Sequence, residues 1–186
     1  MVLVRQKLPM HFDPAGLQAD FRSVAHEDYG DVYNPYVDPD TLYRLDLIEP
    51  EFVPEMDRTP DFKPNARLKS CSAFLHVFES IASPMELMRV HKLAPGASIR
   101  PHRDVGRSFE EGVFRIHVPI DTHPDVETIH AGERVSMAAG ECWYLNFDLT
   151  HEIHNHSDQW RAHLIMDCRR NAWWEAVIGE CTDTRL

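Results

Sequence analysis

The feature that most constrains the fold is a series of short, strand-like segments separated by turn-forming residues, which runs from about residue 86 to residue 168. Gly, Pro, Asp or Ser divides each apolar or alternating segment from the next, a rhythm typical of a β-sandwich or barrel. It predicts a mainly β fold with an antiparallel core, which a double-sheet jelly roll closes most readily. The expected strands are MELMRVHKL, SIRPHRD, GVFRIHVPI, RVSMA, ECWYLNF, HEIHN and WRAHLIMDC, with the polar DTHPDVET among the connections.

The first 65 residues differ from this core, because proline and aspartate are frequent there and exclude a long helix or a central strand. The apolar spacing predicts a helix over 14–25, after Asp13-Pro14, and a second helix over 68–82. The 186 residues are enough for one domain and too few for two of ordinary size. We therefore expect a single domain with a helical and irregular flank and lid (1–85), a β core (86–170) and a short tail (171–186).

Composition excludes several classes of function. The formal charge of -11 and the lack of a basic block argue against a nucleic-acid partner, and no apolar stretch is long enough to cross a membrane. The N-terminus lacks the pattern of a secretory signal, so we expect a cytoplasmic protein. The four cysteines form no CxxC pair, which favours reduced thiols over a zinc site or a disulfide scaffold. Nine of the 12 histidines lie between residues 91 and 163, which raises the hypothesis of a metal site.

The segment IRPHRDVG supplies two candidate metal ligands. In a strand, residues i and i+2 project from the same face, so His102 and Asp104 would point one way and Arg103 the other. Two histidines and one carboxylate on one face of an octahedral ion, with the opposite positions open, is the arrangement that suits non-haem Fe(II). By itself the HxD pattern is weak evidence, since a histidine near an aspartate is usually a surface pair.

The third ligand is expected from THEIHNHSDQW, which contains three histidines. Alternation puts His151 on the same face as apolar Ile153 and Asn155, whereas His154 and His156 share the other face with a glutamate. The apolar residue marks the inner face, so His151 is the predicted ligand. The other two histidines are expected on the solvated outer face.

The placement of two arginine-bearing strands stays open. In WRAHLIMDC, Arg161 alternates with apolar residues, so it lies either on a solvent face or inside the barrel, where its guanidinium could hold a carboxylate. In GVFRIHVPI, Arg115 and His117 share a face in the same manner. Periodicity alone does not separate the two interpretations.

Four ordered motifs resemble the aspartyl/asparaginyl β-hydroxylases, a family of Fe(II)- and 2-oxoglutarate-dependent oxygenases. They are LAPGASIRPHRD, RIHVPI, GECWYLNFDLTHEIHNHSD and RAHLIMD, and the resemblance covers about residues 86–168. It implies a double-stranded β-helix (cupin-like jelly roll) with flanking N-terminal helices, and iron held by His102, Asp104 and His151. Fe(II), the cosubstrate 2-oxoglutarate and O₂ would be its cofactors.

The resemblance also implies that Arg161 binds the distal carboxylate of 2-oxoglutarate, with Arg115 and His117 near its 1-carboxylate end. His91 stands where the family often has a small polar residue. Inward-facing Asn155 and Asp167 are candidates to support a ligating histidine, and Arg100 and Arg107 are candidate substrate contacts, although arginines of this kind are more often solvated.

The expected reaction is hydroxylation of a C–H bond of an amino acid or related small carboxylate, or of an aspartyl or asparaginyl residue, with release of succinate and CO₂. A small-molecule substrate is favoured; oligomeric state is left open. One alternative is a cupin-like metalloenzyme that does not use 2-oxoglutarate and would have no need of Arg161. The other is a non-catalytic module that binds a small acid and would have no need of three metal ligands.

Overall fold

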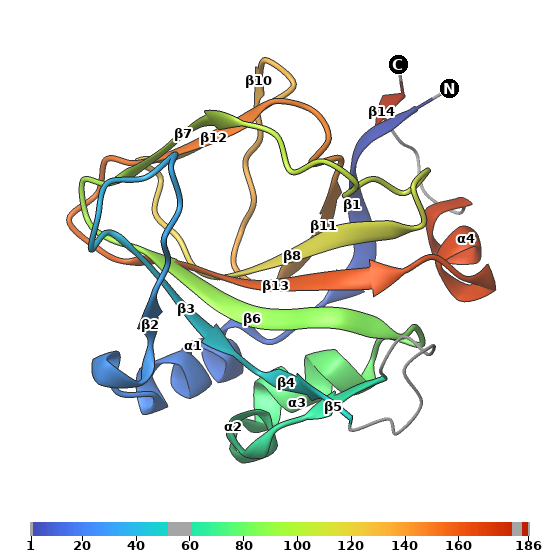
Figure 1. The fold of residues 1–186 in the computed structure, drawn as a ribbon, viewed down its shortest axis with the longest axis horizontal. Helices are drawn as coiled ribbons and strands as arrows, with labels where there is room; N and C mark the ends of the chain where they lie inside the picture. Colours follow the sequence, from blue (N-terminus) through green and yellow to red (C-terminus); the bar gives the residue numbers. More distant parts are fainter. Residues whose placement is uncertain (1, 52–60, 180–183, 186) are drawn as a thin grey trace.

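The computed structural model describes residues 2–51, 61–179 and 184–185. Its centre is a pair of facing sheets, with the small sheet above the large one in Figure 1. The predicted double-sheet jelly roll is confirmed. In the described part of the chain, the large sheet has eight strands in the order β14 (Thr184–Arg185), β1 (Leu3–His11), β11 (Glu141–Leu145), β8 (Val113–Asp121), β13 (Arg161–Arg169), β6 (Met85–Leu93), β3 (Leu42–Asp46) and β2 (Gly30–Asp31).

The small sheet forms the other wall of the barrel. Its order is β10 (Glu133–Arg134), β9 (Val126–His130), β12 (His151–Asn155) and β7 (Ser98–His102). A separate hairpin pairs β4 (Ile48–Pro50) with β5 (Phe62–Pro64). Strand β13 pairs along its whole length with β6 on one side and β8 on the other, so these three strands form the floor of the site.

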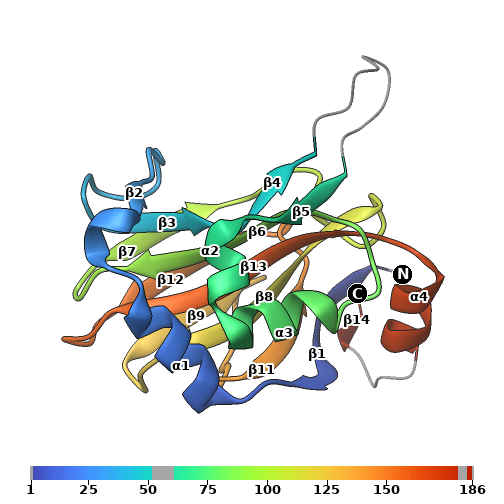
Figure 2. The ribbon, with the colours of Figure 1, turned by 90° about the horizontal axis from the view of Figure 1, so that it is seen from below.

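Helices cover the outer face of the large sheet, as Figure 2 shows from below. They are α1 (Pro14–Ser23), α2 (Ala66–Ser70) and α3 (Ser72–Glu79), with α4 (Ala172–Gly179) at the end of the sheet and a 3-10 turn at His26–Asp28. The main apolar core lies between helices and sheet. It includes Leu17, Phe74 and Val77 from the helices and Phe114, Ile116, Val118, Leu164 and Met166 from the strands.

Helix α1 begins where predicted, because the side chain of Asp13 accepts hydrogen bonds from the amides of Ala15 and Gly16. The single helix predicted over 68–82 is instead two helices. Cys71 is extended between them, and the carboxylate of Asp20 accepts hydrogen bonds from the amides of Ala73 and Phe74 at the start of α3. A side chain of α1 thus caps the N-terminus of α3. The apolar periodicity of the segment does not predict this break between α2 and α3.

The flank contains more strand than the sequence suggested. Strands β1 and β3 extend the large sheet. In the core, β9 begins within DTHPDVET (residues 121–128), which was expected to be a connection, and ends at His130. Of the expected strand RVSMA, only Arg134 lies in a strand. Cys71, Cys142 and Cys168 are buried free thiols, whereas Cys181 lies outside the described residues. None of the helices that the structure describes is long and apolar enough to span a membrane.

Candidate active site

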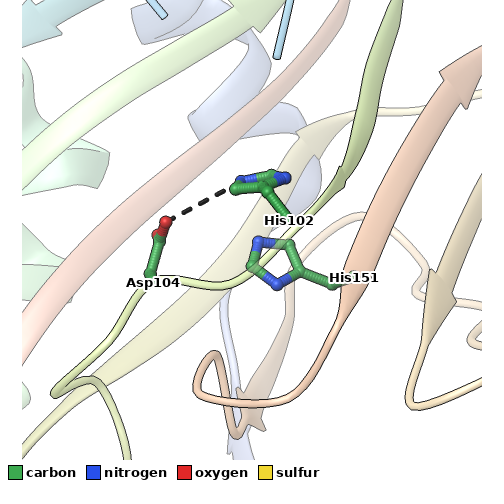
Figure 3. Close-up of side chains that lie close together, drawn as sticks. All are labelled: His102, Asp104 and His151. Atoms are coloured by element: carbon green, nitrogen blue, oxygen red, sulfur yellow. Dashed lines mark ion pairs between the residues drawn. The ribbon is translucent and has the colours of Figure 1, made fainter. Parts of the chain in front are cut away.

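The three predicted metal ligands meet at the mouth of the barrel. His102 ends β7, Asp104 follows it in the next turn, and His151 begins the neighbouring strand β12, directly opposite His102 in the register. One ligand atom from each residue lies within 4.8 Å of the others, and Figure 3 shows the side chains facing one another. The geometry suits one ion held on one side by two imidazoles and a carboxylate.

Backbone carbonyls orient both imidazoles. The Nδ1 of His102 lies 2.8 Å from the carbonyl oxygen of Arg100, and the Nδ1 of His151 lies 3.1 Å from that of Leu149. Each Nδ1 therefore carries the proton, which leaves Nε2 as the free donor for a metal. Burial, with His102 close by, lowers the pKa of His151 to about 4, so this ring stays neutral and able to ligate at neutral pH.

A register shift explains why strict alternation misplaced one residue. Ile153 pairs with Ile99 while His151 pairs with His102, so β7 has one more residue than β12 between these pairs. Ile99 and His102 both line the pocket as a result. Arg100, which lies two residues before His102 and would share its face in a regular strand, instead points outward and is ion-paired with Asp38 at 2.9 Å.

A chain of ion pairs supports the carboxylate ligand. Arg115 donates to Asp104 through Nη1 and to both carboxylate oxygens of Asp167, at 2.7 and 3.0 Å. Arg107 also donates to Asp167, at 3.1 Å. Burial alone would lower the pKa of Arg115, but hydrogen bonds and charges from Asp167 and Asp104 raise it. Asp167 was predicted to support a ligating histidine; its partners are instead Arg115 and Arg107, and Arg115 links it to the ligand Asp104.

Asn155, the other residue predicted to support a ligating histidine, contacts neither of them. Its amide donates to the carbonyl oxygens of Leu93, Ala94 and Gln159, and its side-chain oxygen accepts from Ser157. This fully buried side chain fixes the turn that joins β12 to β13. The backbone carbonyls that accept from the histidines leave no such role for it.

Arg161 lines the same pocket as the three ligands; it is 2 % exposed and lies inside the barrel. This decides between the two interpretations of the last strand, since the guanidinium faces the same pocket as the three ligands. Its Nη2 donates to the Nδ1 of His163 at 3.0 Å. Burial lowers the pKa of Arg161 to about 9, but the group remains cationic at neutral pH.

Three buried polar atoms around this pocket have no hydrogen-bond partner among the described residues: Nε of Arg161, Nε2 of His117 and Nε2 of His91. An unsatisfied buried polar group costs on the order of 1–3 kcal/mol, so such a group commonly awaits a ligand or water. Together with the three metal ligands, these groups fit a small dicarboxylate such as 2-oxoglutarate and an adjoining ferrous ion.

Several pocket residues were not expected from the sequence. Phe147 stacks on His117, with ring centroids 4.9 Å apart, and meets His151 edge-on at 4.5 Å. From the flank, Asn34 lines the pocket and Tyr36 stacks on His102 at 4.7 Å. His91, already noted in the sequence for its place in the family resemblance, also lines this pocket.

The histidines assigned to the outer face lie away from the site. His154 contacts the hydroxyl of Ser98 and the carboxylate of Glu152, and its ring stacks on that of His156. Neither belongs to the group of potential metal ligands found among the described residues. Alternation along β12 therefore selected the histidine that faces the other two ligands.

Comparisons with known proteins agree with this geometry. A family model described as aspartyl/asparaginyl β-hydroxylase matches residues 58–171, more than half of the chain. A 2OG-Fe(II) oxygenase family oxidoreductase from Burkholderia pseudomallei aligns with a TM-score of 0.55 at 12% identity, over 92% of this chain and 81% of that one. A Pseudomonas putida prolyl-4-hydroxylase aligns with a TM-score of 0.52 at 16% identity, over 91% and 94%.

A viral collagen prolyl hydroxylase from Paramecium bursaria Chlorella virus-1, solved with 2OG, also aligns, with a TM-score of 0.51 at 8% identity over 90% of this chain and 96% of that one. At these identities the structural likeness shows the fold alone. No curated protein matches the chain. The family match and the His-Asp-His group together carry the assignment: the chain belongs to the aspartyl/asparaginyl β-hydroxylase family and is a hydroxylase that depends on Fe(II), 2-oxoglutarate and O₂.

Proposed function

We propose that this enzyme hydroxylates a C–H bond of an amino acid or a related small carboxylate, with 2-oxoglutarate converted to succinate and CO₂. The observation that carries the proposal is the single pocket in which three potential metal ligands and three unpartnered buried polar atoms converge. When bound, iron supplies the activation of O₂ that C–H hydroxylation requires. The protein supplies ligands, orientation and the exclusion of water.

Each end of the cosubstrate has candidate partners. The guanidinium of Arg161 is buried in this pocket, where it can donate to the distal carboxylate in a charge-assisted hydrogen bond. The other carboxylate has candidate partners in the same pocket, which His117 and Arg115 line; Nε2 of His117 has no hydrogen-bond partner among the described residues. Arg115 uses three N–H groups on Asp104 and Asp167, which leaves two of its five for that same carboxylate.

The mouth of the pocket favours a small substrate. Tyr36 covers the ring of His102, and the backbone amide of Arg100 donates to the carbonyl of Tyr36 at 2.8 Å, which ties this part of the flank to β7. The side chain of Arg100 adds a bond to the carbonyl of Pro35 at 3.0 Å. A segment held in this way narrows the approach to the metal ligands, which suits an amino acid better than a residue in a folded domain.

A succinate-release screen over free amino acids, dicarboxylates and short peptides tests the proposal, with Fe(II), 2-oxoglutarate and O₂ supplied. We expect succinate release that depends on a free amino acid or small carboxylate. Arg161→Ala should strongly reduce it at low concentrations of 2-oxoglutarate, and the outer-face variant His154→Ala should retain it. Stimulation by peptides alone would contradict the substrate class. Metal-dependent turnover of a substrate without 2-oxoglutarate would instead favour a cupin-like metalloenzyme.

A further inference from the structure

A second cavity, of about 320 Å³, enters the barrel at a place that no metal ligand lines. Its walls come from the turn between β8 and β9, from β9 itself, and from the segment that follows β10. One residue of β13 forms its base. The lining residues are Thr122, His123, Pro124, Val126, Thr128, Arg134, Val135, Ser136, Met137, Ala138 and His163.

His163 separates this cavity from the pocket that contains Arg161. Its side chain is almost fully buried, at 1 % exposure. The Nδ1 edge of the ring faces Arg161, whose Nη2 lies 3.0 Å away, and His117, whose Nδ1 lies 3.3 Å away. Because the two nitrogens of an imidazole lie on different edges, Nε2 points away from these partners, and His163 is the residue of β13 that lines the second cavity.

The protonation state of His163 follows from its neighbour. A guanidinium only donates hydrogen bonds, so Nδ1 of His163 must accept, and the proton of the neutral ring is on Nε2. Burial and the charge of Arg161 lower the pKa of His163, which keeps the ring neutral. Nε2 has no hydrogen-bond partner among the described residues. The base of the cavity therefore offers a free N–H donor.

The rest of the lining suits an anion that carries a carbon chain. Although the chain contains 30 acidic residues, none lines this cavity among the described residues, whereas His123 and Arg134 do. Those two side chains meet carboxylates outside the lining, His123 with Asp125 at 3.5 Å and Arg134 with Glu127 at 3.8 Å. Apolar side chains make up part of the wall, those of Val126, Val135 and Met137.

We propose that this cavity is a binding site for a short-chain carboxylate, whose oxygen accepts the hydrogen bond of His163 Nε2 and whose carbon chain packs on Val135 and Met137. The site is separate from the cosubstrate pocket and shares only the wall formed by His163. Its existence does not rest on the proposed function, because the ligand would contact neither the metal ligands nor Arg161, whose only part is to accept no proton from His163 and so leave it on Nε2. Succinate, a short-chain dicarboxylate, is a suitable probe.

Calorimetric titration of succinate into the iron-free full chain tests this site, with NMR to follow the imidazole signals of His163. We expect two binding events in the wild type, one at Arg161 and one in the cavity. Met137→Trp fills the cavity and should abolish the second event only, whereas the matched variant Met137→Leu keeps both. Val126→Phe, on another wall, is the alternative if the tryptophan variant does not fold.

Two further variants separate this proposal from the proposed function. Arg161→Ala should remove the first binding event and retain the event in the cavity. If Arg161 does not bind the cosubstrate, the first event will be absent or unchanged by this variant, but the event in the cavity will still be observed. His163→Phe keeps the ring but removes the donor, and should weaken the cavity event about ten-fold or more. A single event unaffected by Met137→Trp would show a water-filled cavity only. Equal displacement of succinate by inorganic phosphate would overturn the carboxylate class.

Discussion

The two faces of strand β13 are buried to the same extent but have opposite effects on the stability of the fold. Leu164 and Met166 point toward the helices and are fully buried in the apolar core. Arg161 and His163, which alternate with them, point into the barrel and are 2 % and 1 % exposed. The outward face stabilises the fold by removing apolar surface from water. The inward face opposes folding because it buries polar groups that are incompletely hydrogen-bonded, such as the Nε of Arg161.

The two faces show that the site is recognised by the chemical type of the buried side chains, not by the degree to which they are buried. The neighbouring strand β8 repeats the division, with Ile116 and Val118 outward and Arg115 and His117 inward. Buried polar atoms without partners are rare in native structures, and the interior face of one barrel concentrates several of them. A ligand that satisfies them explains why the chain tolerates their cost.

The largest expected effect comes from removing a ligand on the inward face of β12. His151→Ala should weaken Fe(II) binding by roughly a hundred-fold or more, since even residues that only orient metal ligands contribute about 10–100-fold. His154→Ala, three residues along on the outward face, is the matched control and should bind iron nearly as the wild type does. Metal-binding titrations check this, and the reverse ranking would contradict the inward placement of His151.

An effect on folding is expected from the outward face of β13. Leu164→Ala creates a cavity in a fully buried part of the core and should lower the free energy of unfolding by about 2–5 kcal/mol. Urea denaturation measures the loss. The folded fraction of this variant should bind 2-oxoglutarate as the wild type does. A large change in its affinity for 2-oxoglutarate, with a normal free energy of unfolding, would contradict the separate roles of the two faces.

On the inward face of the same strand, substitutions should affect cosubstrate binding more than stability. Arg161→Ala should weaken 2-oxoglutarate binding by about ten-fold to a hundred-fold, as loss of a charge-assisted hydrogen bond of about 1.5–3 kcal/mol implies. Arg161→Met, which fills the space without a charge, should weaken binding equally but unfold no more easily than the wild type. Arg103→Ala, at the exposed mouth, is the control. Unchanged affinity in the Arg161 variants would show that this guanidinium does not hold the cosubstrate.

The last prediction concerns pH. Burial lowers the pKa of His91, His117 and His163 well below their ordinary value in the folded chain. Below about pH 6.5, these histidines therefore bind protons in the unfolded chain but stay neutral in the folded chain. The free energy of unfolding of the iron-free protein should therefore fall as the pH is lowered from 7 to 5. Denaturation at pH 7 and pH 5 tests this, with His156→Ala as the control; equal stability at both values would contradict it.

Much of the core was predictable because it depends on local alternation. The period of two located most strands from β6 to β13 and separated His151 from His154. Strands β1 and β3 were not predicted, because proline and aspartate nearby hide them and only pairing with distant strands defines them. The same holds for β9, whose sequence resembles a connection.

The site was predictable in composition more than in arrangement. Alternation could not decide whether Arg161 faced solvent or the interior, since this depends on the small sheet closing over the large one. The outward turn of Arg100 follows from a register shift, and Tyr36 reaches His102 from a flank with no periodic signal. Both features arise from tertiary contacts that local patterns do not encode.

The most direct measurement is anaerobic titration of the Fe(II)-loaded protein with 2-oxoglutarate, followed by visible absorption. If the inward face holds iron and cosubstrate together, a metal-to-ligand charge-transfer band should appear and saturate. In Arg161→Ala the band should need a much higher concentration of 2-oxoglutarate. An iron-loaded wild-type protein that develops no band at saturating 2-oxoglutarate would contradict the account.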